Sequence, residues 1–104
     1  MAVNKPLGFR EIREHHDSGA SICALLNGDR GWLMLLRFEG DSGRSSRNPG
    51  YDGAEDAVIE YRLTNGQRDE YPASWALPAS VVMRALKHFE KTGEPAPFVT
   101  WHDD

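Results

Sequence analysis

Cysteine is nearly absent from this chain of 104 residues, and the single one, Cys23, lies inside an apolar run. One cysteine cannot form an internal disulfide, which excludes the small secreted domains that disulfides hold together and favours a reducing compartment. No apolar run approaches the roughly 20 residues that a membrane-spanning helix needs. The first residues also lack the apolar core of a signal peptide. The sequence therefore predicts a cytoplasmic protein with no membrane partner.

An excess of positive charge is also missing. The chain has 12 Lys and Arg against 16 Asp and Glu, a formal net charge of −4. Region 39–70 holds eight acidic and four basic residues, whereas the segments before and after it carry +1 and −1. Binding to the phosphates of nucleic acid is favoured by clustered Lys and Arg, which this acidic centre lacks. We therefore do not expect direct binding of nucleic acid. The acidic centre suits a basic protein partner, such as an enzyme that acts on nucleic acid; the alternative is a solvated loop that serves solubility.

Motifs for metal binding, nucleotide binding and catalysis are absent as well. His15 and His16 are adjacent, so their side chains point apart, and no CxxC, HxxxH or HExxH spacing occurs. Cys23 and a histidine could form a catalytic dyad, but a cysteine in an apolar strand is more commonly a small core residue. The glycines of 40–53 lack the pattern of a phosphate-binding loop. We therefore expect no metal, no cofactor and no catalytic residue, and we interpret the protein as non-enzymatic.

Two segments have the apolar spacing of amphipathic helices. In 79–92 apolar residues recur at intervals of three and four, Pro78 precedes the first turn and Gly93 is a natural left-handed stop. In 7–17 the narrow stripe of Phe9 and Ile12 predicts a shorter helix.

Apolar runs between turn signals predict the strands. Asn27-Gly28 marks a hairpin for which we expect a longer or bulged loop, and Asn65-Gly66 marks a second hairpin. Segment 39–56, rich in Gly and Ser, is expected to be a long loop. The expected strands are 20–26, 32–38, 57–64, 68–71 and 98–101.

The predicted fold class is α+β: one domain over 1–104, with an N-terminal and a C-terminal helix packed on an antiparallel meander sheet of about five strands. Run 32–38 places apolar residues on both faces of its strand, so both faces must be covered. We expect the C-terminal helix on one face and the N-terminal helix, or a partner, on the other.

Three motifs occur in a fixed order and together resemble one protein family. They are Asn27-Gly-Asp-Arg-Gly-Trp32, Asn65-Gly-Gln-Arg-Asp-Glu-Tyr-Pro72, and the closing helix with Thr92-Gly93, Pro95 and Val99-x-Trp101. In this order they resemble the first family of bacterial polymorphic-toxin immunity proteins over about residues 25–101. The resemblance implies an antidote that binds a secreted toxin in a 1:1 complex and covers its active site or substrate path. Toxins paired with this family include nucleic-acid deaminases, so the expected toxin is one that modifies nucleic acid, such as a cytidine deaminase; other toxin domains are the alternative.

Loop placement and charge indicate which residues would contact such a partner. Acidic residues could mimic a phosphate backbone, whereas the two arginines within 39–56 could pair with acidic toxin residues around a metal site. A different hypothesis is a small ligand-binding or enzymatic domain whose pocket lies under the 39–56 loop, and a third is a structural subunit or adaptor. The candidate partner-binding residues are Trp32, Asp41, Arg44, Arg47, Tyr51, Asp52, Glu55, Asp56 and Glu60.

Overall fold

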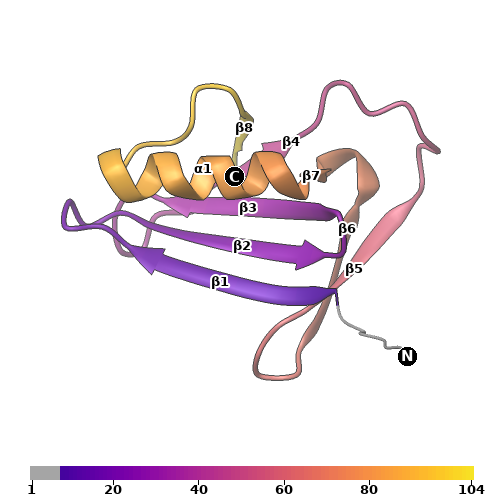
Figure 1. Ribbon diagram of the computed structural model, residues 1–104, viewed down its shortest axis with the longest axis horizontal. Helices are drawn as coiled ribbons and strands as arrows, with labels where there is room; N and C mark the ends of the chain where they lie inside the picture. The colour runs from indigo at the N-terminus through magenta and orange to yellow at the C-terminus, as the bar shows by residue number, and fades with distance from the viewer. Residues whose placement is uncertain (1–7) are drawn as a thin grey trace.

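The computed structural model describes residues 8–104, which form eight strands, one α-helix and one short 3-10 helix (Figure 1). The helix lies on one face of the larger sheet, and a two-stranded hairpin crosses the opposite face. The elements are β1 (Phe9–His15), β2 (Ser21–Asn27), β3 (Arg30–Leu36), β4 (Arg44–Arg47), β5 (Val58–Arg62), β6 (Arg68–Pro72), η1 (Ala73–Trp75), β7 (Leu77–Pro78), α1 (Ala79–Thr92) and β8 (Thr100–Asp103).

All pairings in the larger sheet are antiparallel, in the order β1-β2-β3-β4-β8, and the two residues of β7 also pair with β3. Strands β2 and β3 form a hairpin in which Asn27 pairs with Arg30, so the loop is only Gly28 and Asp29. Gly28 has φ +62°, the conformation that glycine supplies at the first position of a type II′ turn. The hairpin prediction is confirmed, but the expected longer loop is wrong.

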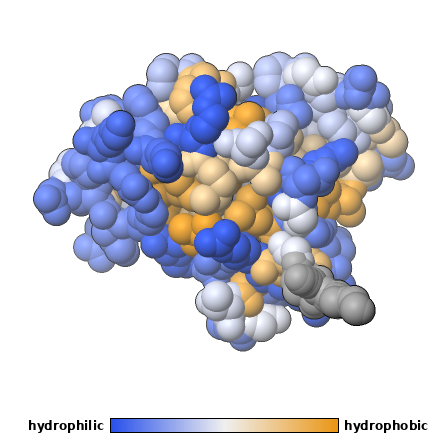
Figure 2. Space-filling model, viewed as in Figure 1, coloured by the Kyte–Doolittle hydropathy of each residue, from blue (hydrophilic) through white to orange (hydrophobic). Residues whose placement is uncertain are grey.

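Helix α1 agrees with its predicted range and packs on β2 and β3. Val82, Leu86 and Phe89 are buried against Leu33 and Leu35 of β3, as the three- and four-residue spacing requires. The seam between helix and sheet reaches the surface as a strip of apolar atoms between hydrophilic side chains (Figure 2). Across residues 8–104, no helix is long and apolar enough to cross a membrane.

The second face of β3 is covered by the β5–β6 hairpin. Leu25, Trp32 and Tyr61 form the buried centre of this smaller core, and Ile59 and Leu63 pack around it. The alternation predicted for 57–64 is therefore confirmed. The expectation that both faces of β3 are covered is also confirmed, although the second cover is a hairpin and no helix.

The predicted N-terminal helix is wrong, because Phe9–His15 is a strand paired with β2 over seven residues; position 7 lies outside the described residues. Only Ile12 of this segment packs against the main core. A helix would gain little from so narrow an apolar stripe, whereas the strand hydrogen-bonds to β2, and the Glu11 carboxylate accepts from the backbone N–H and hydroxyl of Thr64. Its many charges suit an edge strand, where they discourage further pairing.

The expected count of about five strands is wrong as well, because eight are present in two sheets. Part of the difference lies in 39–56, which contains β4 and is not a continuous loop. The serines and arginines of β4 lack the apolar alternation of an ordinary strand, and pairing with β3 and β8 holds the segment extended.

Ser46 closes a gap in the edge of β3. Residues 30 and 31 of β3 pair with β7, while residues 34 and 35 pair with β4. Between them, the backbone N–H of Leu33 donates to Oγ of Ser46 (3.1 Å), and that hydroxyl donates to the Trp75 carbonyl (3.3 Å). Ser46 is fully buried, so no water can replace its hydroxyl.

We expect Ser46→Ala to lower the free energy of unfolding by about 1–3 kcal/mol, because it leaves a buried backbone N–H without an acceptor. Urea unfolding followed by circular dichroism measures the change. Ser42→Ala, at an exposed position, is the matched control and should have no measurable effect. Equal stability of the two variants would contradict the bridging role.

The carboxyl group of Glu14 faces that of Glu90 on α1. Burial raises the pKa of Glu14, and a hydrogen bond with the Glu90 carboxyl and its negative charge raise that pKa further. The folded state therefore binds this proton more tightly than the unfolded chain does. Its stabilising contribution is present at acid pH and is lost as the pH rises through the raised pKa.

We expect Glu14→Gln to stabilise the protein at pH 7 by about 0.5 kcal/mol, since it removes a like-charge contact at a partly exposed site. At a pH below the ordinary value for a glutamate, the gain should vanish because the wild-type carboxyl is then protonated. Thermal unfolding at both pH values tests this, with Glu39→Gln as an exposed control. If the stability gain of Glu14→Gln does not depend on pH, repulsion between the Glu14 and Glu90 carboxylates is not its cause.

Candidate partner-binding surface

The segment that follows β4 forms a loop with a fixed beginning. The side-chain amide of Asn48 donates to the Ala76 carbonyl (3.0 Å), and its backbone N–H donates to the Ser74 carbonyl (3.0 Å). The backbone N–H of Gly50 donates to the side-chain oxygen of Asn48 (3.1 Å). Further along, the Tyr51 hydroxyl donates to the Ala54 carbonyl (2.8 Å). The two Asn48 bonds tie the start of the loop to η1 and to Ala76 directly after it, and the other two bonds lie within the loop.

A surface cavity of about 560 Å³ lies beneath this loop. We call it the loop hollow. The loop forms one wall, the start of β5 a second, and η1 with β7 a third, while the β2–β3 turn closes one end. Its lining residues are Asp29, Arg30, Asn48, Gly50, Tyr51, Asp52, Gly53, Ala57, Val58, Ile59, Ala73, Ala76, Leu77 and Pro78.

Carboxylates surround the loop hollow. Asp29 and Asp52 line it, and Glu55 and Asp56 are exposed on the same loop. Among residues 8–104, no basic group lies within 4.0 Å of any of these four carboxylates. Arg30 is the basic residue of the lining. The negative field around the hollow is therefore not cancelled by close ion pairs.

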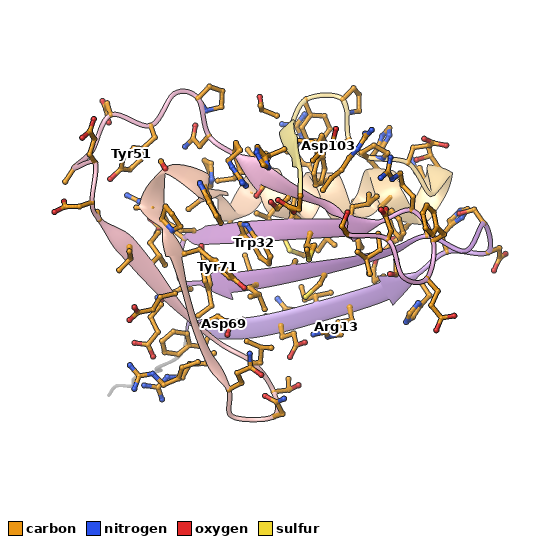
Figure 3. The ribbon with its side chains drawn as sticks, turned by 180° about the vertical axis from the view of Figure 1, so that it is seen from behind. Arg13, Trp32, Tyr51, Asp69, Tyr71 and Asp103 are labelled. Atoms are coloured by element: carbon orange, nitrogen blue, oxygen red, sulfur yellow. The ribbon has the colours of Figure 1, made fainter. Side chains whose placement is uncertain are left out.

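A column of stacked planar groups lies between β3 and the segment that contains β6 and η1; Figure 3 labels two of its members, Trp32 and Tyr71. The rings of Trp32 and Tyr71 stack with centroids 4.4 Å apart, and Tyr71 stacks on Trp75 at 5.9 Å. The Arg47 guanidinium lies 3.8 Å from the Trp75 ring centroid and completes the column. The column connects β3 to β6 and η1, and so holds the hairpin and η1 wall in place.

Strands β4 and β8 carry a second polar group of residues, away from the hollow. Arg44 pairs with Asp103 (2.8 Å), and Arg47 lies 3.9 Å from Asp104. The Ser45 hydroxyl donates to the same Asp104 carboxylate (3.1 Å). Each arginine therefore already has a carboxylate of this chain beside it.

The structure divides the candidate partner-binding residues into two groups. Tyr51 and Asp52 line the loop hollow, and Glu55 and Asp56 are exposed beside it. The other five lie elsewhere and have partners within the chain: they are Trp32, Asp41, Arg44, Arg47 and Glu60.

Three members of the second group show how these residues are engaged within the chain. Trp32 is 6% exposed, and its buried indole N–H has no acceptor among residues 8–104. Asp41 accepts two hydrogen bonds from the Arg37 guanidinium (2.9 and 3.0 Å), which hold its pKa far below the ordinary value. Glu60 lies between Arg62 and Arg68, 2.8 and 3.1 Å from their guanidinium groups. Partner contact by these residues stays a prediction.

Asp29 and Arg30 line the hollow but escaped the sequence analysis. The Asn27-Gly28 turn predicts that these two residues are exposed. It does not predict which distant segment lies beside them. The nearness of this turn to the 48–53 loop depends on β7, whose pairing with Arg30 and Gly31 brings η1 beside the turn.

No chemistry of a nucleophile or metal is assembled at the hollow. Cys23 lies on the second face of the sheet beside Met34, and burial raises the pKa of its thiol, which keeps it protonated. Neither a cysteine nor a histidine lines the hollow. Within 8–104, no three His, Cys, Asp or Glu residues lie close enough to hold a metal ion. What the site offers is a rigid concave surface with negative charge.

Burial raises the pKa of Tyr61 and of Tyr71 to about 12, and the Asp69 carboxylate adds to the effect at Tyr71. The unfolded chain releases these protons near the ordinary value of 10.0, so the free energy of unfolding should fall as the pH rises from about 10 to about 12. Phenolate absorbance should show two late ionisations, and Tyr71→Phe should remove one. If Tyr71→Phe still shows two phenol ionisations near pH 12, Tyr71 is not one of the two buried phenols.

The comparisons with known proteins agree with the three sequence motifs. The profile of one protein family, described as immunity protein Imm1, matches residues 2–103. No curated protein and no solved structure matches the chain. The profile covers nearly the whole sequence, which confirms the resemblance that the motifs indicated. The chain therefore belongs to the Imm1 family of immunity proteins.

Proposed function

We propose that this immunity protein binds its cognate toxin through the surface around the loop hollow and thereby blocks the toxin's active site or substrate path. Membership of the Imm1 family supports an immunity role and a toxin as the partner. The observation that carries the location is the set of four carboxylates at the hollow without a basic neighbour within 4.0 Å among residues 8–104.

The charge of this surface supports a toxin that acts on nucleic acid. An enzyme of that kind needs a basic groove for the phosphate backbone, and carboxylates at the hollow would compete with phosphates for it. A nucleic-acid deaminase, such as a cytidine deaminase, fits this description. Arg44 and Arg47 are engaged with Asp103, Asp104 and Trp75, which favours the acidic loop over the two arginines as the contact.

The proposed complex contains one immunity protein and one toxin in the cytoplasm. It should bury about 1,200–2,000 Å² in total, the range of specific protein complexes. The immunity protein acts by occupying a surface and performs no reaction itself. The acidic residues at the hollow contribute to affinity electrostatically. Val58, which lines the hollow and is 57% exposed, contributes apolar contact area.

The first test is co-expression of the chain with the product of the neighbouring upstream gene. We expect restored growth and a stable complex that co-purifies. If the product is toxic and neither protection nor a complex is observed, the proposed pairing is wrong.

The location of the interface is tested with a charge variant. We expect Asp52→Asn, Glu55→Gln and Asp56→Asn together to weaken toxin binding about tenfold, since each exposed contact contributes up to about 1 kcal/mol. The control variant, Asp17→Asn with Glu39→Gln and Glu94→Gln, removes the same charge from exposed positions elsewhere. Calorimetric titration at low and high salt should show a smaller salt dependence for the first variant alone. Equal affinities for the two variants would place the interface on another surface.

The hypothesis of a small ligand-binding domain keeps one observation in its favour, the presence of a cavity under the loop. A group of shifted pKa in the cavity, such as Cys23 beside a histidine, would favour this hypothesis, but neither a cysteine nor a histidine lines the cavity. A small ligand from cell extract that co-purifies with the chain and is lost on mutation of the lining would favour it over toxin binding.

A further inference from the structure

Resting on the proposed function, we infer that the loop hollow is a socket for one basic side chain of the partner, an arginine or a lysine presented on a protruding loop. Such a side chain has an aliphatic stem and a cationic end. The hollow combines an apolar floor with a carboxylate rim, and its walls are held by hydrogen bonds within the chain.

The floor is aliphatic. Ala57, Val58 and Ile59 come from the β5 side, and four more apolar residues come from η1, β7 and the turn between them. Lys and Arg side chains pack their methylene groups along apolar surface of this kind while the charge remains at the edge. The exposed Val58 also gives the floor apolar area that a partner would cover.

The rim is acidic from two directions. Asp29 lies on the β2–β3 turn and Asp52 on the 48–53 loop, so the two carboxylates approach the hollow from different segments. Glu55 and Asp56 extend the negative charge along the loop. Arg30 offsets one of the two lining charges, which leaves the lining with a net charge of −1, and the loop outside adds −2. The field therefore favours a cation and opposes an acidic side chain.

The socket is formed before the partner arrives. Asn48 fixes the start of the loop, and the Tyr51 hydroxyl is bound to the Ala54 carbonyl. The Tyr51 ring leaves no room at Gly53, where a Cβ would lie 2.5 Å from the Tyr51 hydroxyl oxygen. A preformed site loses little conformational entropy on binding, and the Tyr51 ring adds an aromatic surface for a cation.

Nuclear magnetic resonance titration of the ¹⁵N-labelled full chain tests the socket without the toxin. The probe is N-acetyl-Gly-Arg-Gly-amide, and the counter-probe is the same peptide with Glu in place of Arg. We expect the Arg peptide to shift backbone amides of the lining, such as Gly50, Gly53 and Ala57. We expect the Glu peptide to leave these amides unchanged.

Two variants make the test specific. Asp29→Asn with Asp52→Asn should weaken binding of the Arg peptide about fivefold, since each carboxylate contributes up to about 1 kcal/mol. Asp17→Asn with Glu94→Gln, which removes equal charge from exposed positions outside the lining, should leave the affinity unchanged. Amide shifts of the free variants that differ from wild type only near the substitutions confirm the fold.

The outcomes separate the socket from the proposed function. No shifts at the lining, equal shifts with both peptides, or equal weakening by both variants would overturn the socket even if the toxin still binds. Conversely, specific binding of the Arg peptide together with no protection in co-expression would support the socket and reject the immunity pairing tested.

Discussion

Strand β3 is buried on both faces, and the other elements are arranged around that constraint. Leu33 and Leu35 lie under α1, whereas Trp32 lies under the β5–β6 hairpin. Because apolar residues on both faces of a strand must both leave water, the sheet needs two covers. Ser46 completes the hydrogen bonding of β3 where its edge passes from β7 to β4. The hairpin that covers Trp32 also places β5 opposite η1 and β7, and the loop hollow is the space that remains between them.

The charged groups of the molecule fall into two kinds with different consequences. Asp41, Glu60 and Asp103 each lie beside an arginine of the same chain, and these pairs hold a turn, a hairpin and a sheet edge in place. Asp52 and the exposed acids of its loop have no such neighbour within 4.0 Å in residues 8–104. Paired charges contribute little to the outward field, whereas unpaired ones act on an approaching partner. The surface proposed for the toxin is therefore one at which carboxylates are not neutralised by a close arginine of residues 8–104.

Sequence patterns predicted those parts of the fold in which one local signal dominates. The spacing of Val82, Leu86 and Phe89 located the helix, and the alternation of 57–64 located β5 with the correct inward face. The same rules predicted a helix over 7–17, where the apolar stripe is weak, and pairing of 9–15 with β2 decides the conformation instead. For the candidate site, loop placement named Tyr51 and Asp52, and both line the loop hollow. It missed Asp29, because the contact between the β2–β3 turn and the loop depends on β7.

By itself, the sequence determined the helix and its glycine stop, the two Asn-Gly turns, the acidic centre and the family, because each is written in neighbouring residues or in overall composition. Only the tertiary structure decided that 9–15 is a strand, that β3 shares one edge between two strands, and that a cavity lies under the loop. The tertiary structure also decided which carboxylates form ion pairs with arginines. These outcomes depend on pairings between segments that are distant along the chain, and the energy of such pairings is not contained in either segment alone.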